Sequence, residues 1–389
     1  MRAWCISDGA LWRIDGDEAA EQIESAFAKE IVARGERDRR RQGWKTAPRE
    51  NYRGIIPQSM LWGGGGQSSV NMIPPRFRHA VRGKDADSLY YLIELNGSSA
   101  LFHYRIAEKR ETRIFHHAQF RCRGMAYDAE SDMLVISCEN KDGTANLAVY
   151  DKDGNSKGAV TGGDAVDAAP SCSMREKGVV LFQSAGIARH PQTGHAIALG
   201  PAAINRLHYA SGKLDTIAQD PRYDYLAPRE DRKGNVYYIR RPFERSSAEH
   251  ASSFLKDVLM FPWRIVKALF GWLNFFSTIY GREPLRSSGG PNDQPLERDL
   301  ASLWLHGRMI ELSRVRHEDG RGGLVPASWQ LRRISPDGQE CFVADHVVSF
   351  DLADDGSVFY SNGFEVFHIL QGNPTSRKHS GLIESVSAA

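Results

Sequence analysis

Cysteine is scarce in this sequence, and its spacing excludes two classes of structure. The chain has 5 cysteines in 389 residues, and no two of them form a short pair of the kind that binds zinc. An odd number without a disulfide framework is typical of a reducing compartment. The cysteines fall within or beside expected strands, where they are best interpreted as small buried residues: Cys5, Cys122, Cys138, Cys172 and Cys341.

A strong net charge and a secretion signal are missing as well. The formal net charge is only +2, so no overall field attracts a polyanion, and nucleic acid is not an expected partner. The first residues contain no apolar stretch of signal-peptide length. We therefore expect a cytoplasmic protein, with a peripheral position on the inner face of the membrane as an option.

Common catalytic motifs are absent too. The glycine run at 63–66 could cradle a phosphate through its backbone N–H groups, but no Lys-Ser/Thr follows it, so a flexible connection is expected instead of a P-loop. There is no G-x-S-x-G and no H-E-x-x-H motif. The pairs His116–His117 and His190–His195 have no carboxylate or thiol at a recognised metal spacing. We therefore predict no catalytic residue, no cofactor and no metal.

What the chain does contain is a repeat, which is clearest at residues 120–162. An apolar run at 133–138 and an alternating stretch at 145–150 are both of strand length. The turns between the expected strands are rich in Asp and Gly, which suit tight turns. Four short strands over about 43 residues match one blade of a β-propeller.

The same pattern can be traced along most of the sequence. Further copies span the following ranges: 77–115, 168–218, 223–239 continued at 329–343, and 347–379. The two ends of the chain, 1–14 and 381–389, supply parts of a sixth copy, with 55–62 as a possible fourth strand. A frayed tail and a separate hairpin are the alternative. We therefore predict an all-β protein in which residues 1–389 form one closed propeller of six four-stranded blades, with five or seven blades as alternatives.

The turns before the second strands resemble those of a known propeller group. Two charged residues, a glycine and an apolar strand recur at 176–178, 232–234 and 354–356. A Ser-Pro-Asp-Gly turn stands at 335–338. Over about 77–370 these signals resemble the TolB-like propellers, which are related to WD-repeat proteins. The resemblance implies the fold and, by analogy only, a subunit of a bacterial multi-protein system; fold alone does not define function. TolB is exported, so its location is not carried over.

A helix is expected at 15–41, within a helical insertion at 15–45. Asp15 or Asp17 could cap it, and Ile23, Phe27 and Ile31 recur every four residues. Its end carries a basic cluster: Arg34, Arg37, Arg39, Arg40, Arg41 and Lys45. These side chains could contact phosphate or anionic lipid, or could simply be a solvated helix end that obeys the helix dipole.

An insertion at 245–298 interrupts the fourth copy of the repeat and carries the principal functional hypothesis. Its segment 254–280 is apolar and rich in aromatic residues, with a narrow polar stripe on a helix. Its charges argue against a membrane-spanning helix. The segment instead suggests a helix that lies on a membrane surface or binds a protein partner, which includes a second copy of the chain. The alternative is packing on its own propeller. The predicted binding residues are Phe254, Phe261, Trp263, Arg264, Lys267, Phe270, Trp272, Phe275, Phe276 and Tyr280.

Two points stay open at the level of sequence. Residues 300–315 fit either a helix or a short hairpin around Gly307. The second concerns activity: the leading interpretation is a non-enzymatic scaffold or binding module, and its rival is an enzyme or ligand-binding propeller with a site in the central channel. Candidates for such a site, by strand position, are Arg123, Asp167, Arg229 and Asp351.

Overall fold

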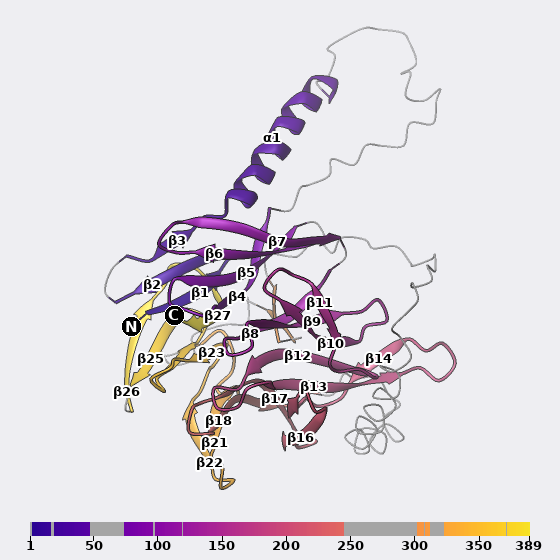
Figure 1. The fold of residues 1–389 in the computed structure, drawn as a ribbon, viewed down its shortest axis with the longest axis vertical. Coiled ribbons are helices and arrows are strands. Elements are labelled where there is room, and N and C mark those ends of the chain that lie inside the picture. The colour runs from indigo at the N-terminus through magenta and orange to yellow at the C-terminus, as the bar shows by residue number, and fades with distance from the viewer. Residues whose placement is uncertain are drawn as a thin grey trace.

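The computed structural model describes residues 2–16, 19–46, 74–95, 98–118, 120–244, 302–306, 308–311, 323–370 and 372–389. Within these ranges the chain is mostly β-strand, with a single helix. The two ends of the chain lie close together (Figure 1).

The first and last strands of the chain belong to one four-stranded antiparallel sheet. The strand order is β27 (Ile383–Ala388), β1 (Arg2–Ser7), β2 (Ala10–Asp15) and β3 (Glu21–Ile23). In the register, Cys5 faces Val386 across β1 and β27, and Trp12 across β1 and β2. The predicted pairing of the two chain ends is therefore present. Residues 55–62, the expected fourth strand, lie outside the described residues, and β3 holds the outer position.

The other strands form consecutive antiparallel meanders. The second sheet contains β4 (Arg76–Arg82), β5 (Ser88–Leu95), β6 (Ser98–Arg105) and β7 (Arg110–Ala118). A nine-stranded sheet follows: β8 (Cys122–Asp128), β9 (Met133–Glu139), β10 (Ala145–Asp151), β11 (Ser156–Ala159), β12 (Ala165–Cys172), β13 (Val179–Arg189), β14 (Ala196–Leu199), β15 (Ala203–His208) and β16 (Lys213–Ala218). One parallel bridge, Ala145 to Val166, joins its two halves.

Two further four-stranded sheets complete the body. One contains β17 (Tyr223–Glu230), β18 (Val236–Pro242), β21 (Gln330–Ile334) and β22 (Glu340–Ala344), and the other contains β23 (Ser349–Leu352), β24 (Val358–Ser361), β25 (Glu365–Leu370) and β26 (Asn373–Lys378). The short strands β19 (Ser302–Leu305) and β20 (Arg308–Glu311) pair only with each other among the described residues. This settles the open choice at 300–315 in favour of the hairpin.

The core lies between neighbouring sheets, and the alternation of side chains along each strand explains it. In β5, Leu89, Tyr91 and Ile93 pack on β1 and β2, whereas Tyr90 and Leu92 pack on β8 and β9. Because successive side chains of a strand point to opposite faces, a strand that is apolar throughout can bury both faces.

Similar apolar layers separate the later sheets. One of them contains Phe359 and Val366 from the last meander together with Cys5 and Ile14 from the first sheet. Packing between sheets therefore joins the beginning of the chain to its end.

Four of the strands that begin a meander share an irregularity. Register shifts interrupt the pairing of β4, β8, β12 and β17, and in β12 and β17 the bulge places Ala169 and Ala227 at positive φ. The bulge of β8 consists of Arg123 and Gly124, and Gly124, with φ 147°, takes the place of Pro170 in β12 and Pro228 in β17. A Cβ there would lie 2.9 Å from Ala169 Cα, so glycine permits the close approach of β8 and β12.

Helix α1 (Ala26–Thr46) begins later than the sequence suggested. Asp15, the expected cap, belongs to β2, and its carboxylate accepts hydrogen bonds from Arg2 Nε (3.0 Å) and Arg13 Nη2 (2.8 Å). The cap is Ser25, whose Oγ accepts from the N–H of Ala28 at 3.1 Å. Glu111 on β7 accepts the N–H of Ala26 at 2.9 Å. The prediction of a helix from residue 15 was therefore wrong, because a carboxylate from another sheet decides where the helix starts.

Candidate functional site

Two of the four residues predicted for a site in the central channel, Arg229 and Asp351, bond to each other across two sheets. Arg229 on β17 donates from Nε to Asp351 Oδ1 on β23 at 2.9 Å. The other carboxylate oxygen, Oδ2, accepts the N–H of Ala388 on β27 at 2.9 Å. Both charged side chains are mostly buried, with 23% and 21% of their side-chain surface exposed. The pair therefore links three sheets, and each of its charged groups is already compensated.

A third candidate, Asp167 on β12, is a buried carboxyl group without a cation among its recorded contacts. Ser184 Oγ donates to its Oδ1 at 2.6 Å, and the Thr161 hydroxyl also contacts it. Burial raises the pKa of Asp167 to about 6, and the two hydroxyls oppose the increase. Because burial disfavours the charged form, Asp167 exchanges a proton nearer to neutral pH than an ordinary aspartate does.

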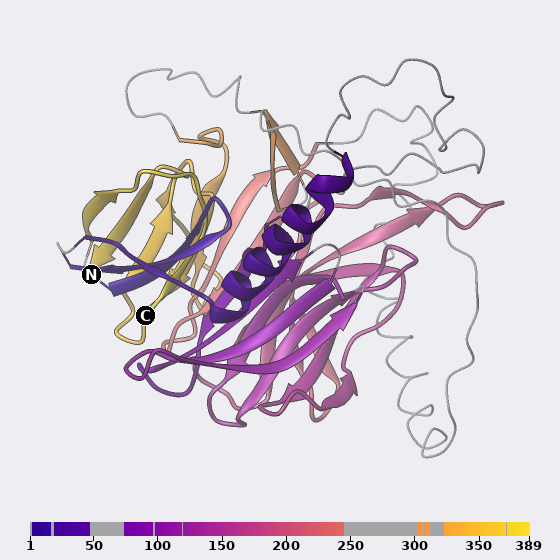
Figure 2. The same ribbon diagram turned by 90° about the horizontal axis from the view of Figure 1, so that it is seen from above.

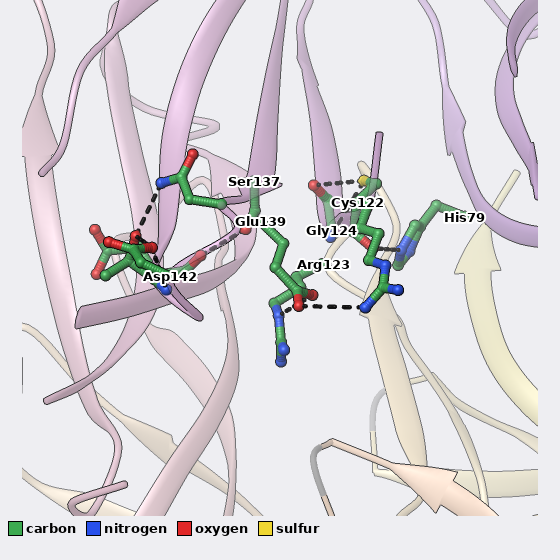
Figure 3. Close-up of polar contacts among 11 residues, drawn as sticks. His79, Cys122, Arg123, Gly124, Ser137, Glu139 and Asp142 are labelled. Carbon is green, nitrogen blue, oxygen red and sulfur yellow. Dashed lines mark hydrogen bonds and ion pairs between the residues drawn. The ribbon is translucent and has the colours of Figure 1, made fainter. Parts of the chain in front are cut away.

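The fourth candidate, Arg123, bonds to a glutamate and not to any of the other three candidates in the contacts described. Its Nε donates to Glu139 Oε2 on β9 at 2.9 Å, as Figure 3 shows beside Cys122 and Gly124. The same view shows His79, whose Nε2 lies 3.3 Å from the backbone oxygen of Cys122. Burial lowers the pKa of His79 to about 4 and raises that of the Cys122 thiol. These groups are neutral or paired at pH 7, so the contacts are structural.

Among the described residues, the remaining polar contacts give no complete catalytic arrangement. Ser88 Oγ lies 2.8 Å from His103 Nε2, but Ser88 is buried, whereas a nucleophile must be accessible. In the described ranges no three His, Cys, Asp or Glu side chains gather as a metal site would require. His116 instead contacts Ser98 Oγ (3.1 Å), and His190 Nδ1 accepts the N–H of Gln192 (3.3 Å).

A polar cluster that the sequence did not reveal holds the hairpin β19–β20 against the body. We call it the hairpin clamp: Asp224, Arg241, His306, Trp329 and Val348. Arg241 donates from Nε to Asp224 Oδ2 at 2.9 Å and from Nη2 to the backbone oxygen of His306 at 3.1 Å. Its guanidinium carbon lies 4.6 Å from the centre of the Trp329 ring. Asp224 and Arg241 are both buried.

His306 completes the clamp from the turn of the hairpin. Its Nε2 lies 2.9 Å from the backbone oxygen of Val348, just before β23. The pKa of His306 is lowered to about 4, mainly by burial; the hydrogen bond to Val348 opposes this decrease, and the charges of Arg241 and Arg229 add to it. The imidazole is therefore neutral at pH 7 and can donate Nε2–H to this carbonyl. Sequence reasoning missed the cluster because its members are up to 124 residues apart.

The predicted binding residues within 254–280 lie outside the described residues, as does the glycine run at 63–66. Among the described residues, no helix combines the length and the apolar character needed to span a bilayer.

Comparisons with known proteins concern the fold alone. No family model matches the sequence, and no curated protein matches it. Among solved structures, the chain is similar to TolB from Acinetobacter baumannii, with 8% identity and a TM-score of 0.52, over 99% of this chain and 65% of that one. It is also similar to a chain of a nidogen/laminin complex, with 7% identity and a TM-score of 0.51, over 99% and 97% of the two chains. The chain therefore has a TolB-like β-propeller fold.

Proposed function

We propose that this protein is a non-enzymatic propeller scaffold that docks on an anionic membrane surface, or on a protein partner, through residues 254–280. We place it in the cytoplasm, peripheral to the inner face of the membrane, as a subunit of a bacterial multi-protein system. We also infer that its sheets form a closed ring of six blades.

The observation that carries the docking proposal is the hairpin clamp. The described residues end at 244, just after β18, and begin again at 302, the first residue of the hairpin. Arg241, at the end of β18, bonds directly to His306 in the hairpin turn. The intervening stretch therefore starts and ends near one place on the body. An aromatic-rich segment on such an excursion can contact a surface without disturbing the sheets.

The six-blade inference is supported by contacts between the central strands. Each of β4, β8, β12, β17, β23 and β27 contacts the next, and β27 contacts β4. Asp351 adds hydrogen bonds to Arg229 on one side and Ala388 on the other. Arg82 on β4 further contacts Asp354, which follows β23.

The same contacts weigh against the rival interpretation, a reaction in the central channel. A catalytic acid or base must come within hydrogen-bond distance of the proton that it transfers. Arg229 and Asp351 instead bond to each other and to the backbone. Asp167 still supports the rival interpretation, because its pKa is near neutral. If Asp167→Asn lowered the affinity for a ligand, that result would favour a site in the central channel.

Liposome flotation tests the docking proposal. We would compare the intact protein with a version in which residues 252–281 are replaced by a short Gly-Ser linker, and check both by circular dichroism. We expect only the intact protein to float, with preference for anionic lipid.

The other outcomes separate the alternatives. If neither protein floats and the deletion stays folded and becomes more soluble, the segment is a partner surface, and pull-down experiments follow. If the deletion unfolds, the segment is core and the docking proposal fails. Arg264→Glu with Lys267→Glu is a matched variant that should weaken only the electrostatic part of membrane binding.

A further inference from the structure

Helix α1 is fixed at one end and extends away from the sheets. Its 21 residues span about 30 Å at 1.5 Å per residue. Figure 1 shows it leaving the body near β3, β6 and β7, and Figure 2 shows the same helix from above. No other described element is a helix.

The base of the helix is held by several contacts. Glu111 and Ser25 cap its first turn, as described above. The Phe27 ring lies 5.2 Å from the Phe102 ring and 5.9 Å from the His116 ring, measured between centroids. The direction of α1 is therefore set by β6 and β7.

Beyond the base of the helix, the side chains that the structure describes point to solvent or bond within the helix. Residues 32–34, 36 and 37 are exposed. Arg34 bonds to Glu30 one turn earlier at 2.8 Å, and Arg37 Nε donates to the Ala33 carbonyl at 3.2 Å. These interactions lie within the helix itself. An isolated polar helix is only marginally stable in water, so a partner that contacts this part of α1 would also stabilise it.

The charge of the protein is concentrated on this helix. Residues 26–46 contain seven basic and three acidic residues, a net of +4, while the whole chain carries +2. The rest of the chain is therefore net negative by two charges. The low net charge of the whole chain, which argued against a polyanionic partner, is therefore the sum of a positive helix and a slightly negative remainder.

The composition of the outer half of α1 indicates the kind of partner. Residues 34–45 contain five arginines and one lysine, with two acidic residues and Trp44 as the one large apolar residue. An in-plane membrane helix or a helix in a protein groove needs an apolar face, which this stretch lacks. Guanidinium groups bind phosphate in a bidentate manner. We propose that α1 binds the phosphate backbone of a nucleic-acid duplex, without sequence preference.

The test is the affinity of the full-length protein for a fluorescently labelled 20-base-pair DNA duplex of mixed sequence, measured by anisotropy between 50 and 200 mM salt. With about four phosphate contacts, log K should fall with log salt with a slope near −3.6, which is a loss of about 10²-fold over this range.

Three variants make the test specific. Arg39/Arg40/Arg41→Ala should weaken binding by about tenfold or more at 100 mM salt and reduce the steepness of the slope by about 2 to 3. Alanine favours the helix, so α1 should remain folded, which circular dichroism would check. The change of the same residues to Lys keeps the charge and should retain most of the affinity. The control Lys141/Lys177/Lys233→Ala removes three exposed charges from the sheets and should leave binding unchanged.

Three outcomes would overturn the proposal. The first is equal affinity and slope for the alanine variant. The second is an equal loss in the control. The third is no binding to the duplex combined with arginine-dependent binding to vesicles containing anionic lipid, which would assign the helix to a membrane surface instead.

Discussion

The arginines of this protein fall into two groups that differ in what they contact. Arg241 and Arg229 lie among the sheets, and each donates to an aspartate at 2.9 Å. Arg34 and Arg37 on α1 are exposed and bond only to groups of their own helix in the recorded contacts. Arginine side chains therefore hold parts of the body together among the sheets, whereas those on the helix stay accessible. Substitutions in the two regions should differ several-fold in their effect on stability.

The largest effect is expected at the buried pair of the hairpin clamp. Asp224→Ala removes the carboxylate that accepts Arg241 Nε and the N–H of Ala202. Removing one partner of a buried ion pair leaves the other charge poorly compensated and costs about 3–5 kcal/mol of unfolding free energy. Urea unfolding would measure it. Asp224→Asn keeps an acceptor for Ala202 and should cost less; equal stability of Asp224→Ala and the unmodified protein would contradict the assignment.

The next effect depends on pH and concerns Asp167. In the folded protein its pKa is about 6, above the ordinary value of 3.8, because of burial. The unfolded chain therefore ionises first as pH rises, and the folded state loses stability between about pH 4 and pH 6. Two pKa units correspond to about 3 kcal/mol. Asp167→Asn should therefore stabilise the protein at pH 8 by up to this amount and have no effect at pH 4, measured by thermal or urea unfolding. The same gain at both pH values would contradict the assignment of the effect to ionisation.

The sequence predicted the strands well, and the reason is local. Asp-Gly turns and apolar runs are properties of neighbouring residues, so the meander 122–161 could be identified strand by strand. The extension of β13 beyond residue 183 and the added strand β14 were not predicted. Residues 196–199 pair with β13 although both strands are partly exposed, and exposed pairing of this kind leaves little pattern in the sequence.

The candidate site was less predictable, because contacts between distant residues decide it. Arg229 and Asp351 could be placed on central strands by counting along the repeat, but their pairing depends on how two sheets meet. The start of α1 depends on Glu111, 85 residues away from Ala26. No local rule favours Ser25 over Asp15 as the cap, since both residue types are good caps.

A smaller effect is expected where Asp351 joins three strands. Asp351→Ala removes the bond to Arg229 and the one to the N–H of Ala388. Because both charged groups are partly exposed, we expect a loss of about 1–3 kcal/mol. Hydrogen exchange should show faster exchange in β27 than in β10, which is far from the substitution. Uniform acceleration in both strands would mean that Asp351 does not act at the junction of the first and last strands.

The smallest effect is expected on α1, where the arginines have an exposed partner. Glu30→Ala removes the ion pair with Arg34, whose side chains are both 61% exposed. Exposed pairs one turn apart contribute about 0.3–0.5 kcal/mol, so the unfolding free energy should hardly change. The substitution also adds one unit of positive charge to the helix. If the helix binds a polyanion, the same variant should bind the duplex more tightly at low salt, although its stability is slightly lower. If Glu30→Ala lowers the stability of the protein but raises its affinity for the duplex, the arginines of α1 serve a partner, unlike the arginines that hold the sheets together.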